Sequence, residues 1–286
     1  VFKCFRLFST IDINLDISLP GAHSASPPTR IVGGKPTEIE KYPSMVQVDY
    51  INLFTDIWSQ SCAGSILTSR YILSAAHCFA GGFYNPNLRR IRAGSTYRNA
   101  GGVIVYVEDA YNHPSYGLRV YDGDITVVKL RSALTYTPVV QRTTIVSQGS
   151  LIPDNFPVVH AGWGRTTDDG IPSEVLLDVT VFTVNNKVCT DRYAAIPDSP
   201  PVTENMICAG LLDIGGRDAC GGDSGGPMYI GNITIGVISW GGECGNGTFP
   251  GVSTNYKIKY NWIYFVLFSQ IFYYAKVFEF YLASLV

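Results

Sequence analysis

Short apolar segments with strand character recur along the chain, separated by turn-forming residues. Examples are residues 44–50, 103–107, 125–130, 158–161 and 233–239, and no long helical period occurs before the C-terminus. Short strands at regular intervals predict an all-β domain, either a barrel or a sandwich. The chain has 286 residues. That length is enough to bury a large core in one all-β domain.

A glycine-dense turn, Cys-Gly-Gly-Asp-Ser-Gly-Gly-Pro at residues 220–227, surrounds Ser224. Glycine lacks the Cβ atom that restricts φ and ψ, so Gly222 can place its N–H beside that of Ser224. Two such donors facing one point form an oxyanion hole for acyl transfer. The alternative is a mobile surface loop, since Gly and Ser are common there. We favour the first interpretation because two further catalytic residue types occur upstream.

The first is His77, which lies beside Cys78 after a strand-like run. Histidine can take the proton of a serine hydroxyl near neutral pH. The other three histidines, His23, His113 and His160, are predicted to be ordinary hydrogen-bonded core or surface residues.

The second is Asp124, which enters an alternating apolar segment and is therefore predicted to point inward. A buried carboxylate needs a partner, and an imidazole N–H is suitable. Asp122 precedes Gly123 and is predicted to be a solvated turn residue.

These residues resemble the motifs of the chymotrypsin-fold serine proteases, and most closely those of insect-type trypsins. The order His77, Asp124, Ser224 is that family's order and differs from the orders of subtilisins and α/β-hydrolases. The resemblance covers roughly residues 31–270. Six motifs carry it: Ile-Val-Gly-Gly at 31–34, Ala-Ala-His-Cys at 75–78, Asp-Ile at 124–125, Gly-Trp-Gly at 162–164, the turn at 222–227 and Ser-Trp-Gly at 239–241.

The resemblance implies two antiparallel six-stranded barrels with the active site between them and a C-terminal helix near residues 256–268. The segment 132–146 would connect the barrels. Ser224 would be the nucleophile and His77 the general base and then acid. Asp124 would orient His77, and the N–H groups of Gly222 and Ser224 would hold the oxyanion.

The resemblance also implies how substrate would bind. Ser239 would donate to Asp124, and Ser239, Trp240 and Gly241 would pair with the substrate backbone. Asp218 would hold an Arg or Lys side chain in the specificity pocket, because a buried carboxylate recognises a guanidinium strongly. Gly241 and Gly251 would keep the pocket walls open.

Four positions depart from the usual trypsin pattern: Ala219, Gly221, Glu243 and Ser253. Ser253 stands where a tyrosine is usual behind the pocket, and Glu243 where a glycine usually lines its mouth. Ala219 removes a hydroxyl that would help to bind lysine. We therefore expect cleavage after Arg to exceed cleavage after Lys.

By family position, the seven cysteines would form three disulfides, which implies an oxidising compartment. The pairs are Cys62–Cys78, Cys189–Cys208 and Cys220–Cys244. Cys4 remains. It is either unpaired, or joined to another chain, or part of an incomplete N-terminal segment.

Both ends of the chain are atypical. The resemblance assigns residues 1–30 as a pro-segment and Arg30–Ile31 as the activation bond, after which the new amine of Ile31 would pair with Asp223. Residues 31–270 form the predicted peptidase domain. Residues 271–286 are an atypical hydrophobic extension. The apolar stretch 260–286 invites a membrane-anchor interpretation, but Asn261, Gln270, Lys276 and Glu279 interrupt it, so an anchor is not favoured.

Composition excludes other classes. The formal net charge is −2 and no basic run occurs, so nucleic-acid binding is not expected. Residues 92–102 lack paired acidic ligands for calcium, and no metal or cofactor is predicted. Asn232 and Asn246 begin glycosylation sequons.

We therefore predict a secreted, monomeric trypsin-like endopeptidase that is made as a zymogen. It would be digestive, and its partners would be protein or peptide substrates and protein protease inhibitors. Two alternatives stay open: a regulatory cascade protease, and a non-catalytic homologue that acts as a binding module.

Overall fold

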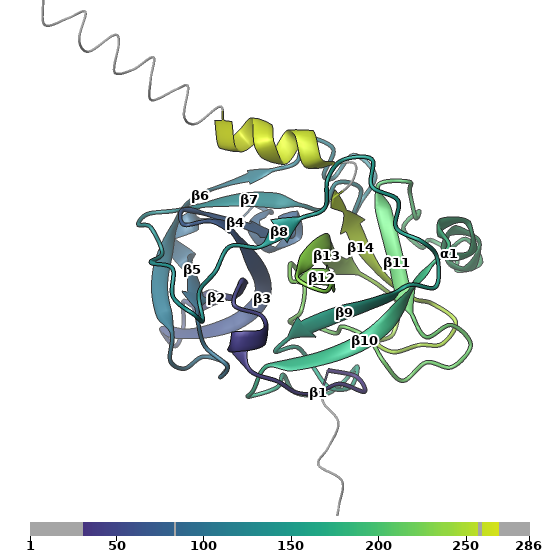
Figure 1. Cartoon of the computed structure of the whole chain (residues 1–286), viewed down its shortest axis with the longest axis horizontal. Coiled ribbons are helices and arrows are strands. Elements are labelled where there is room, and N and C mark those ends of the chain that lie inside the picture. Colours follow the sequence, from purple (N-terminus) through teal and green to yellow (C-terminus); the bar gives the residue numbers. More distant parts are fainter. Residues whose placement is uncertain (1–30, 83, 257–258, 269–286) are drawn as a thin grey trace, which may run out of the picture.

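The computed structural model describes residues 31–82, 84–256 and 259–268. The predicted pro-segment 1–30, including Arg30, Cys4 and His23, and the extension 271–286 lie outside the described residues. Two β-barrels stand side by side (Figure 1). This is the two-barrel architecture that the resemblance implies.

Six antiparallel strands close the first barrel in the order β2-β3-β4-β7-β6-β5. Its strands are β2 (Met45–Asn52), β3 (Ile57–Thr68), β4 (Tyr71–Ser74), β5 (Arg89–Ala93), β6 (Val103–Asn112) and β7 (Thr126–Leu130). Alternate residues point to opposite faces of a strand, so branched apolar side chains such as Val46, Ile66 and Val127 fill the barrel.

The second barrel runs β10-β11-β14-β13-β12-β9 and closes because β9 also pairs with β10. Its strands are β9 (Pro157–Gly162), β10 (Leu177–Val184), β11 (Met206–Gly210), β12 (Pro227–Ile230), β13 (Ile233–Trp240) and β14 (Gly251–Asn255). Two short strands join its edges: β1 (Lys35–Pro36) lies antiparallel to β10, and β8 (Thr144–Ile145) lies parallel to β13.

Helices are few and short in the described part of the chain. They comprise the 3-10 turns η1 (Ile39–Lys41), η2 (Ala76–Phe79) and η3 (Pro86–Leu88), helix α1 (Asn186–Tyr193), and a C-terminal helix at residues 256 and 259–268. Asn185 caps α1 by accepting N–H bonds from the first turn. No helix in the described ranges is long and apolar enough to cross a membrane.

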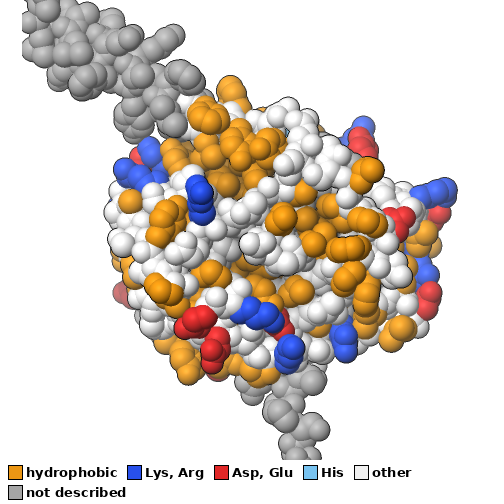
Figure 2. Space-filling model, viewed as in Figure 1, with side chains coloured by type: hydrophobic (Ala, Val, Ile, Leu, Met, Phe, Trp, Pro, Cys, Tyr) orange, Lys and Arg blue, Asp and Glu red, His pale blue; other side chains and the backbone are white. Residues whose placement is uncertain are grey.

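The two barrels are joined by packing as well as by the connecting segment. Met45 and Ala63 of the first barrel share an apolar cluster with Ala161 and Tyr229 of the second. The C-terminal helix follows β14 of the second barrel but places Ile263 in the core cluster of the first. Hydrophobic side chains gather over this helix (Figure 2). The predicted catalytic residues lie where the barrels meet.

Candidate active site

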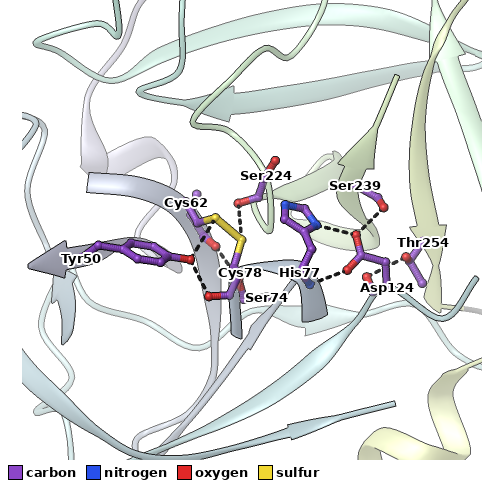
Figure 3. Close-up of polar contacts among 10 residues, drawn as sticks. Tyr50, Cys62, Ser74, His77, Cys78, Asp124, Ser224, Ser239 and Thr254 are labelled. Atoms are coloured by element: carbon purple, nitrogen blue, oxygen red, sulfur yellow. Dashed lines mark hydrogen bonds and ion pairs between the residues drawn. A yellow bond between two sulfur atoms is a disulfide. The ribbon is translucent and has the colours of Figure 1, made fainter. Parts of the chain in front are cut away.

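Three predicted catalytic residues come from separate segments and converge between the barrels. His77 lies in η2, Asp124 lies two residues before the start of β7, and Ser224 lies in the turn before β12. Figure 3 shows the His77 ring between the Asp124 carboxylate and Ser224.

Asp124 is completely buried, yet its oxygens have several donors. The His77 main-chain N–H donates to Oδ1 at 2.8 Å, and His77 Nδ1 lies 2.7 Å from Oδ2. The Ser239 hydroxyl donates to the same Oδ2 at 2.5 Å. A carboxylate in this position requires the proton on Nδ1, which leaves Nε2 as the basic nitrogen.

The loop that carries His77 is braced on its other side. A disulfide joins Cys78 to Cys62 of β3, with a Cα–Cα distance of 6.4 Å. The Tyr50 hydroxyl donates to the Cys78 carbonyl, and the Arg89 guanidinium lies 3.6 Å from the centroid of the Tyr50 ring. These contacts hold the His77 loop in place from the side opposite Asp124.

The turn around Ser224 requires glycine at two positions. Gly222 has φ +103° and Gly225 has φ +83°. Residues with a Cβ atom rarely adopt such positive φ values. A Cβ on Gly225 would also lie 2.2 Å from Ser74 Oγ. The Ser224 carbonyl is held by the Ala63 N–H at 2.8 Å. This close packing fixes the backbone on both sides of Ser224.

Gln60, which sequence reasoning missed, anchors the turn around Ser224. Its side-chain amide donates to the Gly222 carbonyl at 2.7 Å and to the Cys62 carbonyl at 3.0 Å. Arg98 Nε in turn donates to Gln60 Oε1 at 2.9 Å. The Gly222 carbonyl is therefore held by a chain of two polar side chains, of which Gln60 is buried and Arg98 is half-buried.

Asp223 is also completely buried, but its partners are only main-chain amides. Gly164 N–H donates to Oδ1 at 2.7 Å and Cys220 N–H to Oδ2 at 3.0 Å. No Lys, Arg or His in the described ranges forms an ion pair with it. Burial raises the pKa of Asp223 to about 6, and the two amide donors oppose that shift.

The first described residues dock against the segment that carries Asp218. Ile31 is fully buried in the second barrel's core cluster, and Asp218 N–H donates to the Val32 carbonyl at 3.1 Å. Ile31 has φ +48°, which is strained for a β-branched residue.

A cavity of about 200 Å³ opens beside Ser224, with Asp218 in its wall. Gly245 N–H donates to Asp218 Oδ2 at 3.3 Å. A Cβ on Gly251 would lie 2.7 Å from Asp218 Oδ1, so glycine at this position leaves the carboxylate accessible from the cavity. Burial raises the pKa of Asp218 to about 7, so an incoming cation would stabilise its ionised form.

The other predicted pocket residues lie around this cavity. Ser239, Trp240 and Gly241 line one side, and the Cys220–Cys244 disulfide closes another. The third disulfide joins Cys189 of α1 to Cys208 of β11. These are the three pairs that the resemblance implies.

Two aromatic residues that sequence reasoning missed, Tyr121 and Tyr193, support the pocket wall at Trp240. Tyr121 stacks on Trp240 with centroids 5.7 Å apart, and Tyr193 of α1 tilts against Trp240 at 4.8 Å. The Tyr193 hydroxyl donates to the Pro250 carbonyl and accepts the Gly242 N–H. Glu243 is exposed and accepts a bond from Asn246, so its side chain is turned to its own loop.

Two predictions about individual polar residues are wrong. Asp122 is buried rather than solvated, because Thr203 and Asn205 donate to its carboxylate at 2.7 and 2.8 Å. His160 is in the core, as predicted, but neither ring nitrogen has a hydrogen-bond partner among the described protein groups. It lines the cavity that contains Asp218. His113, by contrast, bonds Ser115 as expected.

Two groups of potential metal ligands occur among the described residues: Cys62, His77 and Cys78, and Asp168, Cys220 and Cys244. Each contains both sulfurs of a disulfide. Metals bind the thiolate form of cysteine, which a disulfide does not offer. Neither group is therefore a built metal site.

The two sequons lie in turns. Asn232 is exposed between β12 and β13. Asn246 is half-buried, and its side-chain oxygen accepts the Thr248 N–H at 2.7 Å.

Two six-stranded barrels with Ser, His and Asp side chains in the cleft between them define a serine protease of the chymotrypsin fold. Comparison with known proteins is consistent with this class. The family model described as Trypsin matches residues 31–263. The chain is 43% identical to "Trypsin, alkaline B" of Manduca sexta over 239 residues, which cover 82% of this chain and 90% of the relative.

Two further relatives extend the likeness. "Trypsin CFT-1" of Choristoneura fumiferana is 41% identical over 82% of this chain and 90% of its own length. "Trypsin" of Phaedon cochleariae is 33% identical over 83% and 88%. The chain belongs to the trypsin family and is a trypsin-like serine endopeptidase.

Proposed function

We propose that this protein is a secreted digestive endopeptidase that hydrolyses peptide bonds after Arg or Lys through an acyl-enzyme. The observation that carries the specificity is the buried carboxylate of Asp218 in the cavity beside Ser224. A buried carboxylate without a cation favours a substrate side chain that brings one.

Ser224 is the proposed nucleophile. Its Oγ attacks the substrate carbonyl while His77 Nε2 takes the hydroxyl proton. Asp124 stabilises the resulting imidazolium through its 2.7 Å contact with Nδ1. The N–H groups of Gly222 and Ser224 stabilise the developing oxyanion. His77 then donates its proton to the leaving amine, and the same groups hydrolyse the acyl-enzyme with water.

Substrate backbone would lie along the segment Ser239–Trp240–Gly241 as an added strand. Gly251 and Gly241 leave room for a long side chain to reach Asp218. We expect Arg to be preferred to Lys, because a guanidinium can bond the carboxylate with two N–H groups. Ala219 offers no hydroxyl that would compensate a shorter ammonium.

Activation is proposed to follow cleavage of Arg30–Ile31, which separates the pro-segment 1–30 from a peptidase domain at 31–270; residues 271–286 would form a hydrophobic extension. The buried Asp223 carboxylate, without a cation among the described residues, supports this proposal, because the new Ile31 amine would supply one. Cleavage would also release the backbone constraint on Ile31. Arg30→Gln protein should remain inactive after trypsin treatment, and equal activity to wild type would contradict the proposal.

The family relationship and the three disulfides support secretion. As partners we propose protein or peptide substrates and protein protease inhibitors, with a monomer as the active unit. Expression confined to gut tissue would support the digestive role, and expression outside the gut would favour a regulatory cascade.

The chemistry is tested with an organophosphonate that labels activated serine. The cleaved protein should carry one adduct on Ser224 by mass spectrometry, and His77→Ala should not be labelled. A folded, cleaved protein without the adduct would exclude the mechanism and favour the binding-module alternative. Specificity is tested by kcat/KM on peptides that differ only in the residue before the cleaved bond.

A further inference from the structure

His160 belongs to the specificity pocket although it is remote from Ser224 in sequence. It lies on β9, where its backbone pairs with Met228 of β12 and Val179 of β10. Only 2% of the residue is exposed. Its side chain lines the same cavity as Asp218 and Ser253.

The two ring nitrogens of His160 have no hydrogen-bond partner within the described protein. Burial lowers the pKa of His160 to about 4, so the ring is neutral at the pH of the reaction. A neutral imidazole carries one donor and one acceptor. Leaving such a group unpaired in a buried site is destabilising, so the partner is expected to come from whatever fills the cavity.

The residues around the His160 ring leave room in the cavity for a hydrogen-bond partner. Ser253 of β14 is small and buried beside the same cavity, and Gly251 on the same strand leaves open the approach to Asp218. A guanidinium has five N–H donors, of which a bidentate contact with one carboxylate uses two. The remaining donors need acceptors in the cavity, and the free imidazole nitrogen of His160 is one.

We propose that His160 is a specificity-determining residue whose neutral ring accepts a hydrogen bond from the substrate guanidinium, directly or through one ordered water, and so favours Arg over Lys. This inference rests on the proposed role of Asp218 as the cation site. An ammonium has three donors on one atom at the end of a flexible stem, and so fewer N–H groups to share between Asp218 and His160.

Three variants separate the polarity of His160 from its volume. His160→Leu removes both nitrogens, His160→Asn keeps a polar atom near the position of Nδ1, and His160→Gln keeps one near Nε2. Each cleaved protein is first titrated for functional Ser224 so that only folded enzyme is compared. The readouts are the inhibition constant of benzamidine, which probes pocket binding without acyl transfer, and kcat/KM on matched Arg and Lys peptides.

We expect His160→Leu to weaken benzamidine binding about tenfold, the effect of one hydrogen bond to a charged group. The ratio of Arg to Lys cleavage should fall by a similar factor, mainly through KM for the Arg peptide. At least one of the Asn and Gln variants should restore most of the loss. Unchanged constants in His160→Leu would overturn the inference, and so would a loss that neither polar variant restores, because the residue would then act only by filling space.

The wild-type enzyme supplies a readout that does not depend on the folding of any variant. Benzamidine should shift the ring nitrogen resonances of a buried, neutral histidine in ¹⁵N-histidine-labelled enzyme, and absence of such a shift would count against the contact. Failure of the proposed function is a different result. Wild-type enzyme that does not bind benzamidine and cleaves best after Phe would remove the role of Asp218 itself.

Discussion

Asp124 and Asp223 are both completely buried carboxylates close to Ser224, yet their surroundings differ. Asp124 has the His77 ring, the His77 amide and the Ser239 hydroxyl as partners. Asp223 has two main-chain amides and no cation among the described residues. The first carboxylate is satisfied by the folded chain, whereas the second is suited to a charge that arrives later. Asp218 in the pocket resembles the second.

The largest effect on activity is expected from a change at Asp124, the carboxylate whose partners are all supplied by the folded chain. Asp124→Asn should lower kcat about 10⁴-fold, the loss that the same change brings in a related serine protease, because the amide favours the wrong His77 tautomer. The measurement is kcat on an Arg peptide with active-site titration. An activity loss of less than tenfold would show that Asp124 does not orient the base.

Removing the pocket carboxylate should have the next largest effect. Asp218→Asn should lower kcat/KM for an Arg peptide about 10²–10³-fold, because a buried cation would lose its partner. The rate of labelling by a small uncharged phosphonate serves as the control and should stay near that of wild type. If Arg and Phe peptides were affected equally, Asp218 would be a structural residue rather than the cation site.

Asp223 should make the stability of the uncleaved chain depend on pH. Burial raises its pKa from 3.8 to about 6, so the folded state binds the proton more tightly than the unfolded state. This contribution is therefore complete below pH 3.8 and is lost as pH rises through about 6. In an Arg30→Gln, Ser224→Ala background, which prevents cleavage, the free energy of unfolding should fall by about 3 kcal/mol across that interval.

The matched protein for this measurement also carries Asp223→Asn, which cannot titrate. The difference in slope between the two proteins reports on Asp223 alone. Parallel pH profiles would mean that a cation already neutralises the carboxylate before cleavage, and the contrast with Asp124 would disappear.

The smallest effect is expected from Gln60, which anchors the turn around Ser224 at the Gly222 carbonyl. Gln60→Leu should lower kcat about tenfold with little change in KM, because the hydrogen bond to the Gly222 carbonyl is lost and with it one restraint on the residue whose N–H is proposed to hold the oxyanion. Gln47→Leu is the matched control. Gln47 is an equally buried glutamine that bonds Tyr97 and Asn99 but not the turn. Equal losses in both variants would indicate a general effect on the barrel.

Local sequence predicted the strands well where side chains alternate. The expected strand at residues 125–130 is β7 at Thr126–Leu130, and the one at 233–239 is β13 at Ile233–Trp240. Helix α1 was missed, because its eight residues are too short to establish a helical period. The resemblance, rather than periodicity, selected two barrels over a sandwich.

The sequence by itself determined the candidate nucleophile, the candidate general base and the carboxylate that would orient the base. Ser224, His77 and Asp124 each lie in a distinctive local pattern, and glycine requirements are local backbone properties. Only the tertiary structure decided which polar side chains join them. Gln60, Asp122 and His160 lie in ordinary sequence contexts, and their partners or cavities are formed by strands distant along the chain. Whether a buried polar group is satisfied depends on the strands and loops packed around it, which its immediate sequence does not specify.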